Sequence, residues 1–205
     1  LSDPLERFLP AFAGQQVFVG GTADAPETVP AERPITIADL LTHTAGLSYS
    51  ILTQHPVDEM YRKVGLGALD LGCNLTERID LGATLPLRHQ PGTRWSYSMA
   101  TDVLGRVVEV VDGRPFAEAL QARILDPLGM LDTGFKVNDE SLRRMTSCYA
   151  FSSDEEPALL DRGLSTAFRE PSWDSGGGGL VSTMADYHRF CSALLGGGAL
   201  GGRRV

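Results

Sequence analysis

The stretch QPGTRWSYSMATDVLGRVVEVV, residues 90–111, contains two aromatic residues at a position where a side chain can take part in chemistry. Trp95 and Tyr97 lie in the few residues between a Pro-Gly turn and the start of a strongly patterned helix. Core aromatics usually lie inside an element, where they bury large areas. An aromatic residue at the start of a helix either holds a corner or presents its polar group. For Tyr97 that group is a hydroxyl, which can move a proton in a reaction.

Other motifs give weaker indications of chemistry. The string GGGALG (196–201) matches Gly-x-Gly-x-x-Gly, but it follows a helical pattern instead of a strand, so it indicates a helix stop and a turn. The string GLSTA (163–167) resembles a nucleophile elbow around Ser165, yet it ends in Ala and no apolar strand precedes it. An unrelated α/β-hydrolase that uses Ser165 is therefore a minor alternative. No metal site or cofactor is expected, because the histidines lack metal-ligand spacing: His43, His55, His89 and His188.

Composition narrows the class of protein. The 205 residues are enough for one substantial domain or two small ones, and 42% hydrophobic with 21% charged residues is typical of a globular protein. A net charge of −8 disfavours nucleic acid or an anionic membrane as partner, because both attract basic patches. No apolar run approaches the roughly 18 residues of a transmembrane helix. The three scattered cysteines are expected to be free thiols.

The residues after Tyr97 give the strongest secondary-structure prediction. Apolar side chains recur there at helical spacing and should be buried along one face: Ala100, Val103, Leu104, Val107, Val108 and Val111. Asp112 and Gly113 should end this helix. The next predicted helix, 115–125, should be broken by Pro127 and Gly129.

The remaining pattern predicts a helix-rich chain with short strands. Thr36 and Asp39 have capping-box spacing at the start of a predicted helix, 36–43, and Asp3 is expected to cap a helix at the beginning of the chain. The other predicted helices are 55–64, 75–83 and 183–195, and the predicted strands lie near 16–19, 133–137 and 146–151. Residues 152–178 are expected to be mostly loop. The glycines at 176–179 either bring backbone close to a ligand or form a flexible lead-in to the last helix, and the second is favoured.

Three strings occur in an order that resembles one family. They are PITIADLLTHTAGLSY, PGTRWSYSMATDVLGRVVEVVDGRPFAEALQARILDPLGMLDTGF and GGGGLVSTMADYHRFCSALLGGG. Together they are similar to the serine β-lactamase-related family, which holds class C β-lactamases, D,D-peptidases and carboxylesterases. The resemblance implies an α+β, helix-rich fold in which an antiparallel sheet is flanked by helices and carries an inserted helical domain. Residues 1–205 would be an internal part of one such domain, with about 36–195 mainly the helical subdomain. The sheet-forming parts would lie outside the segment.

The resemblance also implies a reaction. The family acylates the Ser of a Ser-x-x-Lys motif, and a Tyr on a loop of the helical domain helps to move its proton. Tyr97 matches that Tyr. A phenol has a pKa near 10, so it serves as a base only beside a cation such as the motif's lysine. The two lysines, Lys63 and Lys136, do not form a Ser-x-x-Lys. The nucleophile is therefore expected upstream of Leu1, and residues 1–205 alone are expected not to hydrolyse esters.

Position 99 bears on the substrate. In the β-lactamases and peptidases of the family, an Asn two residues after the Tyr can contact the amide carbonyl of the substrate. Met99 occupies this position and donates no hydrogen bond. The expected substrate is thus a small-molecule ester, with β-lactamase or D,D-peptidase activity, or a non-catalytic binding role, as alternatives.

Three further residues are candidates for supporting Tyr97 or lining the substrate site. His43 ends the predicted helix 36–43, where its ring can bond to loop backbone or favour the negative helix terminus, so a structural role is preferred to that of a general base. Trp95 is expected to support the site by core packing, with a wall for an apolar acyl or alcohol group as the alternative. Trp173 is a weaker prediction for a wall that binds an apolar acyl or alcohol group.

Overall fold

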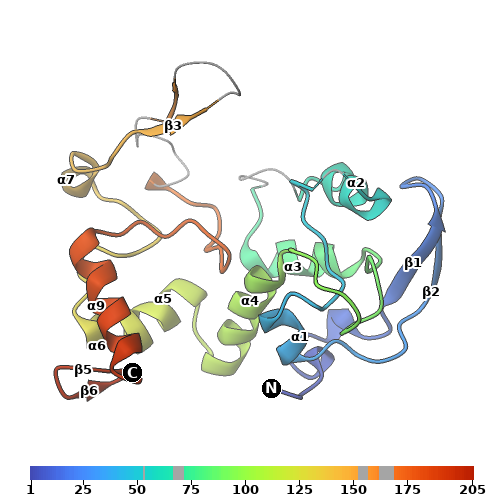
Figure 1. The fold of residues 1–205 in the computed structure, drawn as a ribbon, viewed down its shortest axis with the longest axis horizontal. Coiled ribbons are helices and arrows are strands. Elements are labelled where there is room, and N and C mark those ends of the chain that lie inside the picture. Colours follow the sequence, from blue (N-terminus) through green and yellow to red (C-terminus); the bar gives the residue numbers. More distant parts are fainter. Residues whose placement is uncertain (53, 67–71, 152–156, 162–168) are drawn as a thin grey trace. The chain divides into compact units, whose positions relative to one another are not determined.

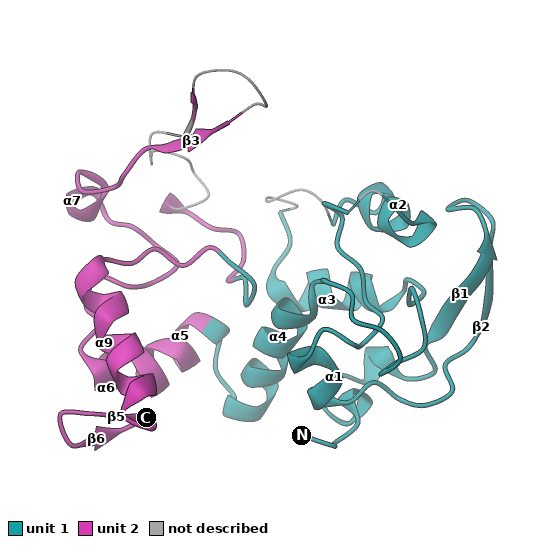
Figure 2. Ribbon diagram, in the orientation of Figure 1, with its two compact units in different colours: residues 1–116, 175–178 teal, residues 117–174, 179–205 magenta. Residues whose placement is uncertain are grey.

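The structure is a computed structural model that describes residues 1–52, 54–66, 72–151, 157–161 and 169–205 (Figure 1). These residues form two compact units (Figure 2). Unit 1 contains Leu1–Phe116 and Ser175–Gly178, and unit 2 contains Ala117–Asp174 and Gly179–Val205. The division brings a short segment from late in the chain into unit 1. The predicted elbow around Ser165 lies outside the described residues.

Unit 1 is built from short helices and one hairpin. Its elements are η1 (Leu5–Arg7), η2 (Pro10–Phe12), β1 (Gln16–Gly21), β2 (Pro26–Pro30), α1 (Ile37–Leu41), α2 (Pro56–Lys63), α3 (Leu75–Ala83) and α4 (Ala100–Asp112). The antiparallel β1–β2 hairpin is joined to the helical part by two backbone hydrogen bonds of Leu87, each 2.8 Å long. The N–H of Leu87 donates to the carbonyl of Gln16, and its carbonyl accepts from the N–H of Phe18. The predicted strand near 16–19 is confirmed as part of β1.

Local capping residues explain where three helices begin. In α1, Thr36 accepts from the N–H of Asp39 while the Asp39 carboxylate accepts from the N–H of Thr36, which is the predicted capping box. Asn74 and Glu77 form the same reciprocal pair in α3. In α2 the cap is His55, whose Nδ1 accepts from the N–H of Val57 at 3.2 Å. The predicted helices at 36–43, 55–64 and 75–83 are confirmed.

Helix α4 begins and ends as predicted, but its buried face differs. Gly113, with φ +74°, ends the helix in the left-handed conformation that glycine adopts easily. The predicted stripe is buried only in its first half, because Val108 is exposed and Val111 is 67% exposed. The buried face instead includes Asp102 and Gly105. The buried face is rotated because residues 175–178 pack against Asp102 and Gly105. A pattern of apolar residues cannot predict contacts that are made by a carboxylate and a glycine.

Unit 2 has its own small core. Its elements are α5 (Phe116–Leu120, of which Phe116 belongs to unit 1), the π-helical turn η3 (Gln121–Leu125), α6 (Asp126–Leu128), α7 (Asp139–Leu142), β3 (Cys148–Ala150), β4 (Ala158–Asp161), α9 (Met184–Leu195), β5 (Ala199–Leu200) and β6 (Arg203–Arg204). The core consists of Leu125, Leu128, Met130 and Ala193. The predicted final helix is confirmed as α9, whose cap is Thr183. The strand expected within 146–151 is confirmed as β3.

Several predictions for unit 2 were wrong in detail. Pro127 does not break the helix, because the preceding turn is π-helical and helical structure continues to Leu128 before Gly129 ends it at φ +67°. Around Gly134 there is only an isolated bridge to Val181, where a strand was expected at 133–137. Residues 158–161 form β4 within the stretch expected to be mostly loop, because β3 offers them an antiparallel partner.

Two predictions for unit 1 also need correction. Asp3 does not cap a helix, because its carboxylate pairs with Arg7 at 2.8 Å and only the single 3₁₀ turn η1 forms. Of the glycines at 176–179, Gly176 and Gly177 pack against the backbone and side chains at the start of α4, so these two are not a free lead-in to the last helix. Among the described residues, no helix combines the length and the apolar character needed to cross a bilayer.

The start of α9 depends on one buried carboxylate, which gives a test of unit 2. Asp186 accepts from the N–H of Asp132 at 2.8 Å and from the Thr133 hydroxyl at 2.9 Å. Asp186→Ala leaves the N–H of Asp132 without this acceptor and the Thr133 hydroxyl with Ser182 alone, and it should lower the free energy of unfolding by about 2 kcal/mol. Glu140→Ala, which removes an exposed carboxylate from the same unit, is the control. Equal denaturation midpoints for the two variants would contradict this role for Asp186.

Candidate active site

Two loops of unit 1 hold the segment that contains Tyr97. The first follows α1 and runs from His43 to Ser48, and the second runs from Gly92 to Met99. Backbone bonds join them at three points: Gly92 N to Thr44 O at 2.8 Å, Ser96 N to His43 O at 2.8 Å, and Met99 N to Ser48 O at 3.1 Å. Tyr97 therefore lies between two fixed backbone positions, one residue after Ser96 and two before Met99.

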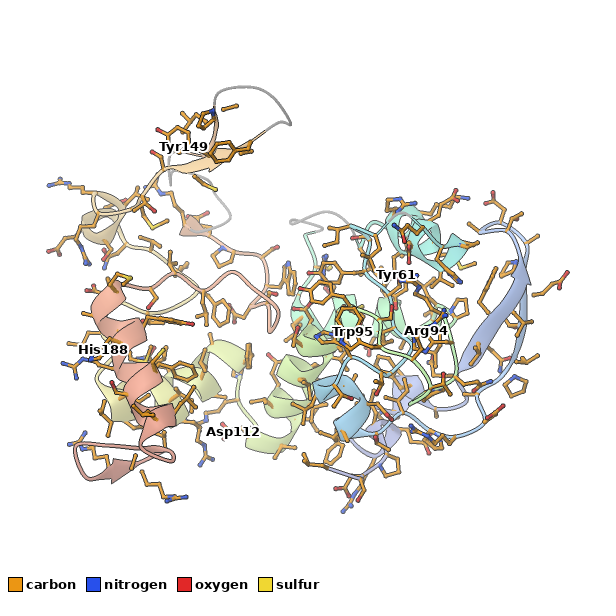
Figure 3. All side chains as sticks on the ribbon, viewed as in Figure 1. Tyr61, Arg94, Trp95, Asp112, Tyr149 and His188 are labelled. Atoms are coloured by element: carbon orange, nitrogen blue, oxygen red, sulfur yellow. The ribbon has the colours of Figure 1, made fainter. Side chains whose placement is uncertain are left out.

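Four aromatic rings lie around the seam, the line along which these two loops pair. The Tyr97 ring lies 5.1 Å from the His43 ring and 5.8 Å from the Tyr49 ring, measured between centroids, and Trp95 lies 6.4 Å from His43. Trp95, labelled in Figure 3, is 64% exposed, and Tyr97 is 42% exposed. No described residue hydrogen-bonds to the Tyr97 hydroxyl. The ring is thus held by its neighbours while its hydroxyl can meet an incoming group.

His43 adopts an unusual backbone conformation in this cluster. Its φ of +54° is the only positive φ of a non-glycine residue among those described, and it turns the chain sharply after α1. The carbonyl accepts from Ser96, and ring Nδ1 lies 3.4 Å from the Ser98 hydroxyl. These contacts agree with a structural role, in which the ring supports Tyr97 from one side. The partner of the ring is a side-chain hydroxyl, whereas loop backbone or the helix terminus was expected.

An ion pair fixes the loop after α1 to the Pro-Gly turn. Arg33 donates two hydrogen bonds to the Asp39 carboxylate, 2.7 and 2.9 Å long, and Thr36 and Thr44 also donate to it. Burial disfavours the charge of Asp39, but the hydrogen bonds from Arg33 and Thr36 outweigh it and lower the pKa of the carboxyl to about 2. Gly92 has φ +82°, and a Cβ there would lie 2.0 Å from the Arg33 guanidinium. The pair therefore requires glycine in the turn.

A second polar network lies beneath the site and was not predicted. The Ser48 hydroxyl donates to buried Asp58 of α2, and Arg88 lies 3.6 Å from the same carboxylate. Arg88 also donates to the Ser96 hydroxyl at 3.1 Å. Both loops of the seam are thus connected to α2. The spacing of His55 and Asp58 is that of a capping box, so this contact could have been predicted from the sequence. The contact between Asp58 and Ser48 could not, because Ser48 lies before the helix in another loop.

Met99 and Trp173 are placed differently from Tyr97. Met99 is 4% exposed, and its sulfur would lie 3.0 Å from a Cβ added to Gly82 of α3. The thioether is therefore part of the core, and no polar group of residue 99 faces solvent beside Tyr97. Trp173 is partly buried and belongs to unit 2. The structure thus brings His43, Trp95 and Tyr97 together and buries the side chain of Met99 beneath them.

The residues that could supply other chemistry are already engaged. Lys63 pairs with Asp24 at 2.6 Å and Glu59 at 3.1 Å. Thr133, three residues before Lys136, donates its hydroxyl to Asp186, so a Thr nucleophile there is disfavoured. In the part of the chain that the structure describes, no three His, Cys, Asp or Glu side chains form a group that could hold a metal ion.

Comparison with known proteins identifies the family. The family model described as "Beta-lactamase" matches residues 1–205, the whole chain. The chain belongs to the beta-lactamase family. The predicted resemblance and the α+β β-lactamase/transpeptidase-like fold are therefore confirmed.

Relatives within the beta-lactamase family include esterases. Lovastatin esterase from Penicillium rubens is 39% identical over 202 residues, covering 95% of this chain and 48% of the relative. Esterase EstB from Burkholderia gladioli is 32% identical over 212 residues, covering 95% and 50%. The solved structure of EstCE1, described as a hydrolase with promiscuous acyltransferase activity, has a TM-score of 0.77 at 29% identity, covering 100% of this chain and 54% of that one. The chain spans about half the length of these relatives.

The ion pair of Asp39 makes a prediction about acid stability. Because the folded-state pKa of about 2 lies below the ordinary Asp value of 3.8, the stabilisation is present above about pH 4 and is lost as the pH falls through 2. Asp39→Asn should cost about 1–2 kcal/mol at pH 7, an amount limited by solvent screening because Arg33 is 43% exposed. The difference between wild type and variant in chemical denaturation should vanish near pH 2. The exposed Asp80→Asn should show no such dependence, and a difference that stays constant from pH 7 to 2 would contradict the argument.

Proposed function

We propose that the chain is part of a serine hydrolase that works through an acyl-enzyme and acts as a carboxylesterase on small-molecule esters. The observation that carries the proposal is the half-exposed Tyr97, whose ring is held by His43 and Tyr49 while its hydroxyl has no described partner. Membership of the beta-lactamase family and the esterase relatives support it. In this proposal, residues 36–195 are mainly the helical subdomain of one domain that extends beyond the segment.

The proposed reaction proceeds in two steps. The hydroxyl of a serine outside the segment, in a Ser-x-x-Lys motif, attacks the ester carbonyl, and its proton passes to the Tyr97 oxygen. The alcohol leaves with a proton, which Tyr97 returns. Water then attacks the acyl-enzyme, releases the acid and restores the serine. Tyr97 can accept a proton only if a cation stabilises its phenolate, and the lysine of the motif would supply that charge.

Ester substrates are favoured over β-lactams by the surroundings of Tyr97. Residue 99, which in lactam-hydrolysing members provides an amide, is here a buried Met without a donor. Trp95, exposed beside His43, offers an apolar surface to an acyl or alcohol group. Trp173 remains a proposed substrate contact with less support.

Acyl transfer to an alcohol is a second candidate function. Monacolin J acid methylbutanoyltransferase from Aspergillus terreus is 31% identical over 203 residues, and EstCE1 is described as having promiscuous acyltransferase activity. The same acyl-enzyme would serve both reactions, because an alcohol can replace water in the second step. Product analysis with and without an added alcohol distinguishes the two. A non-catalytic binding role would give neither product.

Replacement of one hydroxyl tests the catalytic role. In the full-length protein, Tyr97→Phe should lower kcat for nitrophenyl esters by about a hundredfold to ten-thousandfold, the range typical of a lost acid–base group. Its thermal stability should stay close to wild type, because no described residue hydrogen-bonds to the hydroxyl. Tyr187→Phe, which removes an exposed hydroxyl from α9, is the matched control. Wild-type turnover in Tyr97→Phe would mean that Tyr97 has a structural role and no part in proton transfer.

A change at position 99 tests the preference for esters. Met99→Asn should lower the free energy of unfolding by about 2–4 kcal/mol, because buried apolar volume is lost. Its amide should turn toward the site and lower the ratio of ester to β-lactam kcat/KM, measured per folded enzyme. Met99→Leu, which stays apolar, should keep the wild-type ratio. If the Asn and Leu variants share one ratio, position 99 has no part in substrate selection.

A further inference from the structure

A buried carboxylate at the start of α4 has no part in the proposed reaction. Asp102 is 1% exposed and lies three residues after Met99, the residue that precedes the helix. A carboxylate at this position commonly reaches back to the first N–H groups of its own helix. Asp102 instead accepts from the Ser175 hydroxyl at 2.6 Å and from the N–H of Gly177 at 2.9 Å. Its hydrogen bonds therefore serve a segment more than seventy residues away.

The docked segment, Ser175–Gly178, fits only because it contains glycine. A Cβ at Gly176 would lie 2.1 Å from the carbonyl oxygen of Thr101, and one at Gly177 would lie 2.9 Å from the Thr101 hydroxyl. The Ser175 hydroxyl also lies 3.1 Å from the N–H of Gly177, which it can accept. Backbone thus packs directly on the first turn of α4, and Asp102 holds it there.

The same helical turn is connected to the candidate catalytic residue. The N–H of Met99 donates to the carbonyl of Ser48, next to Tyr49, and the Tyr49 ring contacts the Tyr97 ring at a tilted angle. Burial raises the pKa of Tyr49, and the negative charge of Asp102 raises it further, whereas Arg78 opposes the rise. These charges act on Tyr49, whose pKa the neighbouring Tyr97 also raises. The connection from Asp102 to Tyr97 itself is geometric and runs through the first turn of α4, Met99, Ser48 and the Tyr49 ring.

We infer that Asp102 is a positioning residue for Tyr97, which fixes the first turn of α4 through Ser175 and Gly177 and thereby holds the Met99–Ser48 junction and the Tyr49 ring beside Tyr97. The inference rests on the proposed function. Small displacements of such a group are costly, since a shift of about 1 Å can reduce the rate a hundredfold.

The test uses the full-length enzyme with Asp102→Asn, which keeps an acceptor oxygen but removes the charge. We expect kcat for a nitrophenyl ester to fall by about tenfold to a hundredfold with little change in KM. Asp80→Asn, an equal charge change at an exposed site of α3, should leave both kcat and KM unchanged.

Ser175→Ala is a milder change if Asp102→Asn folds poorly. It removes one hydrogen bond of the docked segment and leaves Asp102 in place. We expect a fall in kcat of about threefold to tenfold with little change in KM, since one hydrogen bond contributes about 1 kcal/mol. Wild-type kcat in Ser175→Ala would overturn the inference.

A raised KM with unchanged kcat in Asp102→Asn would also overturn the inference, because a displaced Tyr97 should slow the chemical step and leave substrate binding intact. The outcome for Tyr97→Phe keeps the two ideas apart. If Tyr97→Phe loses activity but Asp102→Asn behaves as wild type, only the inference about Asp102 is wrong. If Tyr97→Phe keeps full activity, the proposed function itself is wrong.

Discussion

The pairing of two loops is the constraint on which the candidate site depends. The carbonyls of His43 and Ser48 accept from the N–H groups of Ser96 and Met99, and these two bonds flank Tyr97. Both loops are irregular, so their conformation has to be enforced by side chains. On one side this is done by the Arg33–Asp39 pair and on the other by the network of Asp58 and Arg88. The backbone on both sides of Tyr97 is thus held by ion pairs of the scaffold, which is the kind of support that the proposed proton transfer would need.

Features set by neighbouring residues could be predicted from the sequence, and features set by distant contacts could not. The capping pairs of α1 and α3 span only three residues, so the spacing Thr36–Asp39 fixed one helix start. The buried face of α4 was predicted wrongly because it is determined by Ser175–Gly178, which contributes no apolar side chain. The continuation of helix past Pro127 depends on a π-helical turn, for which the sequence carries no clear signal.

The same distinction applies to the candidate site. Tyr97 and His43 were found because they belong to short strings typical of the family, and the structure brings them into ring contact. Tyr49 was not singled out, although it lies in one of those strings, because its contact with Tyr97 crosses from one loop to the other. Asp102 was missed for a different reason: inside an apolar helical pattern, an Asp is expected to face solvent. Only its burial showed that it has another role.

The charges around Tyr97 explain why the described residues do not form a complete catalytic centre. Asp102 opposes ionisation of the neighbouring Tyr49, and the described cation acting on that phenol, Arg78, is largely buried. Lys63 is held by two carboxylates on the surface. The lysine of unit 1 is therefore already engaged away from Tyr97. The proposed reaction consequently takes its cation from the Ser-x-x-Lys motif outside the segment, while Asp102 fixes the helical turn that adjoins Tyr49.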